Sequence, residues 1–288
     1  MSIGIVTDTA CDLSIASLLR MGVAVAPHTI TLGEERHRDW RDVDPPTLYE
    51  WMLDQNKLPQ AEAPEPEMFI DVYRRFLELH EEIISVHVSA KLSKTLEHAR
   101  TAAKALQVED RITFVDSEAA SVALAEIVTG AAELAAEKSS KQHILWEIER
   151  IKKHMKLLCT PESLEWLVRY KQTGRPEGLI STVTQQRPLY ILNGGAFDKQ
   201  GTLTYHRVTD NLISLLHDVF GTTPIRLVMG TAGNNRADIE SLKLSFGLSG
   251  LDVVKGRVQM LGGFMTCRFG PGTIVVCAYP ALSSALSV

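Results

Sequence analysis

The sequence predicts an α/β protein of two domains, residues 1–155 and 156–288. The first half alternates short apolar runs with longer amphipathic runs, an order typical of a parallel sheet with helices on both faces. In the second half the pattern changes, and shorter predicted strands separate the predicted helices. At 288 residues the chain is long for one core and suits two domains of roughly 100 to 150 residues.

The elements of the first half follow from apolar periodicity and from prolines. Pro45 and Pro46 suit the start of a helix, and Asp44 before them is a suitable cap. Residues 58–66 carry three prolines, so we expect an extended loop, long enough to close over a ligand. The predicted strands are 3–6, 23–32, 83–88 and 111–115, and the predicted helices are 14–21, 45–55, 67–80, 94–106, 118–138 and 143–155.

In the second half, glycines bracket one short apolar segment. Gly262 and Gly263 precede residues 264–269, and Gly270 and Gly272 follow them, which allows a close backbone approach to a ligand or strand. The predicted strands are 157–159, 189–192, 203–208, 226–229, 252–254 and 274–278, and the predicted helices are 164–170, 211–220 and 236–246.

Composition narrows the class of protein. The chain is 45% hydrophobic with a net charge of −5, which argues against a nucleic-acid-binding protein, since those need a basic surface. The four cysteines are scattered without metal-site spacing, so we expect buried thiols and no bound metal. Residues 119–136 contain Glu126 and Glu133, so we read them as a packed helix. No signal peptide is evident, and we expect a cytoplasmic monomer.

The stretch from residue 83 to residue 99 is the strongest candidate for a binding site. A buried strand runs into a polar turn and a helix, which gathers the hydroxyls of Ser89, Ser93 and Thr95. With Ser93 as N-cap, the free backbone N–H groups of the first helical turn suit an anion. Alternatively, Ser93 and Thr95 only cap the helix.

A second stretch of the same kind opens the chain. A short apolar strand is followed by Thr7, Asp8 and Thr9 and then by a helix. Two parallel strands place their ends along one edge of the sheet, where open α/β sheets bind ligands.

Six short motifs follow one another along the chain: residues 7–13 (TDTACDL), 88–95 (VSAKLSKT), 115–117 (VDS), 174–175 (GR), 187–189 (RPL) and 270–272 (GPG). In this order they resemble the motifs of the DegV family, bacterial fatty-acid-binding proteins of the EDD fold, some of which hand the acyl chain to a fatty acid kinase. The resemblance covers nearly the whole chain and implies a three-layer N-terminal domain with a parallel sheet, a two-layer C-terminal domain with a mixed sheet, and a lipid held between them.

The resemblance also implies roles for single residues. Ser93 stands where a serine binds the fatty acid carboxylate, and Arg175 corresponds to an arginine associated with a partner kinase and phosphoryl transfer. No cofactor other than the fatty acid is implied. The other ligand-binding positions are Thr7, Thr9, Ala61, Lys94, Arg268 and Gly270.

Three of these positions depart from the family pattern. Ala61 replaces a threonine, Lys94 a glycine and Arg268 a histidine, so the site exchanges hydrogen-bonding groups for two cations. Lys94 and Arg268 can replace the lost bonds, because charge-assisted bonds are roughly twice as strong as neutral ones. Alternatively, Glu62 pairs with one of them and cancels the added charge.

An enzyme is the competing interpretation. The chain contains no phosphate-binding loop, no dinucleotide fingerprint, no nucleophile elbow and no H-x-x-x-H pair. A hydrolase or transferase would use Ser93 or Thr9 with Asp8 or Asp116 as acid and base. Alternatively, these acids accept backbone N–H groups in their own turns. The chain could also bind another amphipathic acid, and the histidines nearest the site are His28, His87 and His98.

Overall fold

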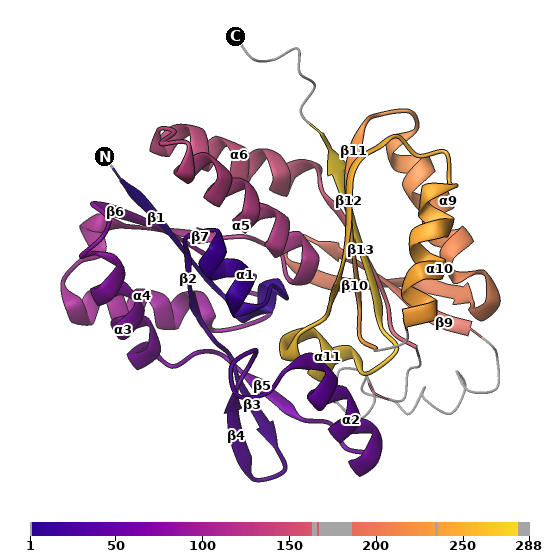
Figure 1. The fold of residues 1–288 in the computed structure, drawn as a ribbon, viewed down its shortest axis with the longest axis horizontal. Coiled ribbons are helices and arrows are strands. Elements are labelled where there is room, and N and C mark those ends of the chain that lie inside the picture. The colour runs from indigo at the N-terminus through magenta and orange to yellow at the C-terminus, as the bar shows by residue number, and fades with distance from the viewer. Residues whose placement is uncertain (1, 163–165, 167–185, 234–235, 282–288) are drawn as a thin grey trace.

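The computed structural model describes residues 2–162, 166, 186–233 and 236–281 (Figure 1). Their strands form a four-stranded, a six-stranded and a small three-stranded sheet. The chain leaves the four-stranded sheet for the six-stranded one between α6 (Lys141–His154) and β8 (Lys156–Thr160). The division into two domains at residue 155 is our interpretation of that switch.

The four-stranded sheet is parallel, as the alternation of strands and helices predicts. Its strand order is β2-β1-β6-β7, and every neighbouring pair runs in the same direction. The carboxyl ends of β1, β6 and β7 therefore meet at one edge. The bounds are β1 Ile3–Asp8, β2 Val23–Ala26, β6 Glu82–His87 and β7 Ile112–Asp116.

Helices cover both faces of this sheet. Ile5 and Val86 pack with α1, α5 and α6, while Val6 and Ile83 point to the opposite face and pack with α3 and α4. This alternation follows from the two-residue period of a strand. The bounds are α1 Ile15–Arg20, α3 Pro66–Phe76, α4 Thr95–Leu106 and α5 Ser121–Ala136.

The single strand predicted for residues 23–32 is wrong, because the chain breaks between β2 and β3 (Thr29–Leu32). Pro27 has no N–H for a ladder, and the backbone N–H of His28 donates to Thr9 Oγ1 at 3.0 Å. β3 then pairs with β4 (Glu35–Arg38) and β5 (Gln60–Glu62) in the small antiparallel sheet. The proline-rich loop is extended as predicted, and it contributes β5 to this sheet.

The C-terminal half forms the six-stranded sheet in the order β10-β9-β8-β13-β11-β12. The sheet is mixed, because β11 and β12 run parallel while the other pairs are antiparallel. The bounds are β9 Gln186–Asn193, β10 Ala196–Thr204, β11 Ile225–Thr231, β12 Val253–Met260, β13 Ile274–Pro280, α9 Val208–Phe220 and α10 Arg236–Gly247.

Two predicted strands of this half are placed or sized incorrectly. The strand at 203–208 ends at Thr204, because Val208 opens an apolar stripe continued by Leu212 and Leu216 at helical spacing. The strand at 252–254 runs on to Met260, since β12 is a partly exposed edge strand whose apolar run is interrupted at residues 255–257. Of the helix predicted at 164–170, only residue 166 lies within the described residues.

The segment bracketed by glycines is a helix, α11 (Gly263–Phe269), which the sequence did not predict. It packs near α2, whose observed bounds, Pro45–Gln55, match those expected from Pro45, Pro46 and the Asp44 cap. The side chain of Asp44 accepts the N–H of Thr47 at 3.0 Å. Helix α11 therefore brings C-terminal residues against the N-terminal half.

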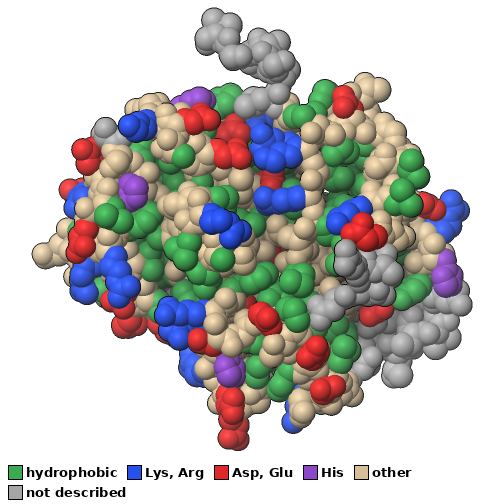
Figure 2. All heavy atoms as spheres, viewed as in Figure 1, with side chains coloured by type: hydrophobic (Ala, Val, Ile, Leu, Met, Phe, Trp, Pro, Cys, Tyr) green, Lys and Arg blue, Asp and Glu red, His purple; other side chains and the backbone are tan. Residues whose placement is uncertain are grey.

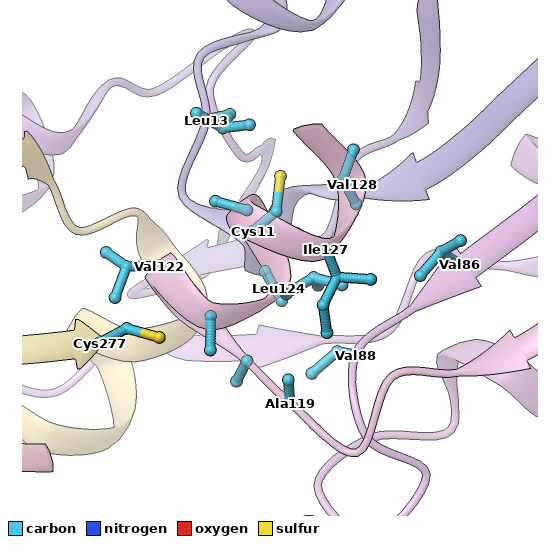
Figure 3. Packing of buried hydrophobic residues seen from close by; sticks show 14 of the residues in the cluster. Cys11, Leu13, Val86, Val88, Ala119, Val122, Leu124, Ile127, Val128 and Cys277 are labelled. Atoms are coloured by element: carbon cyan, nitrogen blue, oxygen red, sulfur yellow. The ribbon is translucent and has the colours of Figure 1, made fainter. Parts of the chain in front are cut away.

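The main core lies between the two large sheets. Helix α5 contacts β1 on one side and β11 and β13 on the other, so one buried cluster joins both halves of the chain. Two polar contacts extend this junction: Tyr279 Oη donates to Glu126 Oε2 at 2.6 Å, and Arg257 pairs with Glu126 at 2.8 Å. Figure 3 shows α5 with β6 and β13, labelling Val86, Val88, Val122, Leu124, Ile127, Val128 and Cys277.

The surface and the cysteines agree with the composition. On the face shown in Figure 2, acidic and basic side chains are interspersed rather than gathered by sign. All four cysteines are buried free thiols, as expected: Cys11, Cys159, Cys267 and Cys277. Among the described helices, none combines the length and hydropathy needed to cross a membrane.

Candidate ligand-binding site

The turn after β6 builds the centre of the site. The N–H groups of Leu92 and Ser93 both donate to the carbonyl of Ser89, which folds the chain back before α4. Lys94, rather than Ser93, occupies the N-cap position. The predicted N-cap, Ser93, therefore lies one residue before the observed N-cap, but Ser93 Oγ still accepts the N–H of Thr95 at 3.3 Å. The start of α4 therefore presents a hydroxyl and a cation side by side.

A pocket of about 360 Å³ opens at this turn, and we call it the Ser93 pocket. It is lined by β5 and the loop after it, by the turn before α4, and by one face of α11. Four residues predicted from the sequence come together in its lining: Ala61, Ser93, Lys94 and Arg268. Phe264, Leu92 and Ala63 add apolar surface beside these polar groups.

Arg268 is held against the Ser93 turn. Its Nη2 donates to the carbonyl of Leu92 at 3.2 Å, and its Cζ lies 4.6 Å from the ring centroid of Phe264. The predicted proximity of Arg268 to this turn is confirmed by that hydrogen bond. A guanidinium stacked on an aromatic ring is favourable and fixes the direction of the charge.

Glu62 lines the pocket but forms an ion pair with Arg36 of β4, at 2.9 Å. The alternative in which it pairs with Lys94 or Arg268 is therefore replaced by a partner that the sequence did not suggest. Both members of the pair are about half exposed, so its contribution to stability is small. His98 Nδ1 and the carbonyl of Pro64, 2.9 Å apart, join the proline-rich loop to α4.

Three other predicted ligand residues lie outside the lining of this pocket. Thr7 is buried within β1, and Thr9 lies in the 3-10 turn (Thr9–Cys11) that packs beneath α11. Gly270 has a φ of 82° and its Cα faces the side chain of Trp166. The side chains of Thr7 and Thr9 are both fully buried. Arg175 lies outside the described residues.

The carboxylates proposed as acid and base serve the backbone. Asp8 accepts the N–H groups of Ala10 and Val88, each at 3.0 Å, and Asp116 accepts those of Ala90 and Glu118. Burial raises the pKa of Asp8, but the hydrogen bond from His87 and the other favourable contacts outweigh it and hold the pKa below its ordinary value. The interpretation of these acids as turn acceptors is confirmed.

The hydroxyls around the turn face different ways. Ser89 donates to the carbonyl of Gly195 at 2.7 Å, on the side of the β9–β10 hairpin. Ser93 Oγ lies 2.8 Å from Thr95 Oγ1, and in the described residues no hydrogen bond joins Ser93 to Asp8 or Asp116. Within the described residues, the side-chain hydrogen-bond partner of Ser93 is therefore a hydroxyl and not a carboxylate.

Behind the pocket lies a buried polar network that the sequence only hinted at. His28 and His87 flank Asp8, and neither histidine is exposed. His87 Nε2 continues to Ser85 at 2.7 Å, and Ser85 to the hydroxyl of Tyr73 at 2.8 Å. The signal in the sequence was the position of the histidines at strand ends, without any indication that both would meet one aspartate.

Two buried carboxylates fix α11 from the N-terminal half. Asp12 Oδ1 accepts the N–H of Gly262 at 2.7 Å, and Asp39 Oδ1 accepts that of Gly263 at 3.1 Å. Burial raises the pKa of Asp12 to about 8 and that of Asp39 to about 7. The described ranges contain no group of three His, Cys, Asp or Glu side chains that could hold a metal ion.

A second cavity, of about 430 Å³, lies in the C-terminal half and shares no lining residue with the Ser93 pocket. Arg187 lines it and is itself buried, with its guanidinium donating to the carbonyls of Thr160 at 2.9 Å and Pro161 at 3.1 Å. Burial lowers the pKa of Arg187. Arg187 thus ties backbone segments of the C-terminal half together.

Solved structures share this architecture. A DegV family protein from Thermus thermophilus, described as binding fatty acid, is 29% identical, with a TM-score of 0.87 over 98% of this chain and 100% of that one. DegV from Bacillus subtilis is 21% identical, with a TM-score of 0.83 over 98% of this chain and 100% of its own. At that identity the second likeness concerns the fold alone, and it agrees with the predicted two-part α/β architecture.

Sequence relatives agree with the fold. A DegV domain-containing protein of Deinococcus radiodurans is 30% identical over 70% of this chain and 71% of its own length. A second, from Streptomyces coelicolor, is 26% identical over 95% of this chain and 97% of its own. The family profile described as "Uncharacterised protein, DegV family" matches residues 2–281. The chain belongs to the DegV family.

Proposed function

We propose that this protein binds a long-chain fatty acid between its two halves, with the carboxylate at the Ser93 turn, and acts as a carrier rather than as an enzyme. The observation that carries the proposal is the Ser93 pocket, where a hydroxyl, two cations and the start of α4 meet apolar side chains. The Thermus thermophilus relative, described as fatty acid binding, supports the ligand class.

The chemistry of the pocket suits an ionised head group. Ser93 supplies a hydroxyl, the first turn of α4 supplies positive potential, and Arg268 supplies a guanidinium that can bond a carboxylate twice. Lys94 adds a second cation at the same edge. Ala61 offers no hydroxyl, so the cations take over part of what the family's threonine would supply.

The acyl chain needs only an apolar slot. Each buried CH₂ contributes about 0.8 kcal/mol, so a long chain gains high affinity without any catalytic group. Phe264 and Leu92 begin such an apolar surface at the pocket.

The test is the acyl content of the protein itself. The purified protein is denatured and extracted, and the extract is analysed by mass spectrometry. We expect a fatty acid in near-stoichiometric amount, and much less in a Ser93→Ala, Arg268→Ala double variant prepared in parallel. A different amphipathic acid in the extract would favour the broader binding role, and an empty protein that also fails to bind added dodecanoate would refute the proposal.

We further propose a cytoplasmic monomer that presents its lipid to a fatty acid kinase, with Arg175 at the contact. This rests on the Gly174-Arg175 motif. Arg175→Ala should keep its lipid but lose phosphorylation of that lipid by a cognate kinase, and loss of the lipid from a folded variant would refute the role.

A further inference from the structure

Ser93 is the outer end of a hydrogen-bonded chain that leads into the protein. Ser93 Oγ lies 2.8 Å from Thr95 Oγ1, and Thr95 Oγ1 lies 3.3 Å from Nε2 of His28. Thr95 and His28 are fully buried, whereas Ser93 is partly exposed in the pocket. The two hydroxyls, which we call the hydroxyl pair, therefore connect the proposed carboxylate site to an imidazole that solvent does not reach.

The other side of the imidazole faces an acid. His28 Nδ1 lies 3.8 Å from Asp8 Oδ1 and 3.4 Å from Thr9 Oγ1. The remaining charged or titratable neighbours are His87 of β6, bonded to Asp8 at 3.0 Å, and Arg268 of α11. The Phe264 ring packs against His28 with the ring centroids 5.1 Å apart, and Cζ of Arg268 lies 4.6 Å from the centroid of the same ring.

These contacts assign the direction of each hydrogen bond. We place the single proton of neutral His28 on Nδ1, because a lone pair there would face the carboxylate of Asp8. Nε2 then accepts from the Thr95 hydroxyl, and Thr95 Oγ1 accepts from Ser93. Both hydroxyl protons point inward, so Ser93 turns a lone pair towards the pocket.

That direction is wrong for an anion. A carboxylate accepts hydrogen bonds and repels a lone pair, so the hydroxyl pair as described favours a proton donor at Ser93. Burial lowers the pKa of His28 to about 4, which keeps the imidazole neutral while no second anion is near. A carboxylate at Ser93 changes this balance, because His28 then lies between two negative charges.

We propose that His28 takes up a proton when a carboxylate binds at Ser93 and that the hydroxyl pair reverses direction. Nε2–H then donates to Thr95, Thr95 to Ser93 and Ser93 to the ligand. When the ligand arrives as the neutral acid, its O–H bond breaks and an N–H bond forms at Nε2, the proton passing along the two hydroxyls. When it arrives as the anion, the proton comes from solvent. This inference rests on the proposed function, since it needs a carboxylate in the Ser93 pocket.

The protonation state of His28 can be measured at its imidazole nitrogens. Nitrogen-15 chemical shifts in histidine-labelled protein distinguish neutral from protonated rings, and His28→Gln identifies the His28 signals. The probes are dodecanoate and dodecanol at saturation, which share a chain length but differ in charge. We expect His28 to be neutral in the free protein and with dodecanol, and protonated with dodecanoate.

Two variants of Thr95 distinguish proton transfer along the hydroxyl pair, which we call the relay, from a packing role of this side chain. Thr95→Val keeps the side-chain shape but breaks the hydroxyl pair, so His28 should stay neutral with dodecanoate and affinity should fall roughly tenfold, about one hydrogen bond to a charged group. Thr95→Ser restores the hydroxyl and should restore both protonation and affinity.

The outcomes distinguish the inference from the proposed function. Dodecanoate bound with His28 still neutral, or His28 protonated equally by dodecanol, overturns the relay while leaving fatty acid binding in place. Failure of dodecanoate to bind overturns the fatty acid proposal, and the relay with it.

Discussion

At the scale of single residues, two serines of the same turn allow a role in ligand binding to be distinguished from a role in stability. Ser93 faces the pocket, and Ser89 is bonded to Gly195 on the other side. Ser93→Ala should weaken fatty acid affinity while the protein stays folded, since the lost cap-like bond to Thr95 costs about 0.5 to 2 kcal/mol.

Ser89→Ala is the matched control for this change. It should lower the melting temperature without changing affinity, as measured by thermal unfolding and ligand titration. Unchanged affinity in Ser93→Ala would remove the head group from this turn.

Arg268 should matter more than Ser93. Removing one member of a buried charged pair typically costs about 2 to 5 kcal/mol, so Arg268→Ala should weaken binding more than Ser93→Ala. Arg268→His should retain part of the affinity below roughly pH 6.5 and lose it as pH rises, because a histidine is charged only below its pKa. Titrations at acid and alkaline pH measure both.

The Glu62–Arg36 ion pair predicts that Glu62 and Arg268 act independently on lipid dissociation. Because Glu62 has its own partner, the effects of Glu62→Ala and Arg268→Ala on lipid dissociation should add in the double variant. Strong non-additivity would instead mean that the two residues are coupled across the mouth.

Asp39 links stability to pH. Burial raises the pKa of Asp39 well above the ordinary value of an aspartate, to about 7, so the folded state holds a proton that the unfolded chain releases. The stabilising contribution of this carboxyl is complete below its pKa in the unfolded state and is lost as the pH rises through its pKa in the folded state. The stability of the wild type relative to Asp39→Asn should therefore fall by up to about 1.4 kcal/mol per unit between about pH 5 and 7.

Urea unfolding over that range measures the difference. Asp44→Asn is the control, because the pKa of Asp44 is lowered by its hydrogen bonds with Thr47, so neither state of that group titrates there. A difference for Asp39→Asn that does not change with pH would mean that the carboxyl stays ionised.

At the scale of elements, α11 couples the two halves to the site. Its first N–H groups are held by Asp12 and Asp39, while Phe264 and Arg268 line the pocket. A small displacement of this helix should therefore change stability and affinity together.

Gly263→Ala tests this coupling. The added Cβ would meet the side chain of Ile30 and lie 2.9 Å from Asp39 Oδ1, so we expect a loss of roughly 1 to 3 kcal/mol in stability and weaker lipid binding. Gly247→Ala, whose Cβ meets nothing within 4 Å, is the control and should leave both nearly unchanged. Full affinity in a destabilised Gly263→Ala would separate α11 from the site.

At the scale of the whole molecule, one core joins both large sheets through α5. The chain should therefore unfold in a single cooperative transition despite having two sheets, with calorimetric and van't Hoff enthalpies equal. Tyr279→Phe, which loses the bond to Glu126, should lower the midpoint without splitting the transition. Two resolved transitions in scanning calorimetry would show that the halves unfold independently.

The sequence by itself determined the features that depend on neighbouring residues. Alternation of apolar runs predicted the parallel sheet, and Asp44 with Pro45 predicted the start of α2. The motifs predicted the family and brought Ser93 and Arg268 forward as site residues. These signals are local, because capping, proline geometry and strand periodicity act over a few residues.

Only the tertiary structure decided the contacts between distant segments. Asp12 reaches Gly262 across 250 residues, Glu62 of β5 pairs with Arg36 of β4 across the intervening strand β3, and His28 meets both Asp8 and Thr95. Helix α11 was missed because tertiary contacts with Asp12 and Asp39 support the first turn of a segment only seven residues long. Short helices are marginal by themselves, so their formation depends on the packing that surrounds them and not on their own residues.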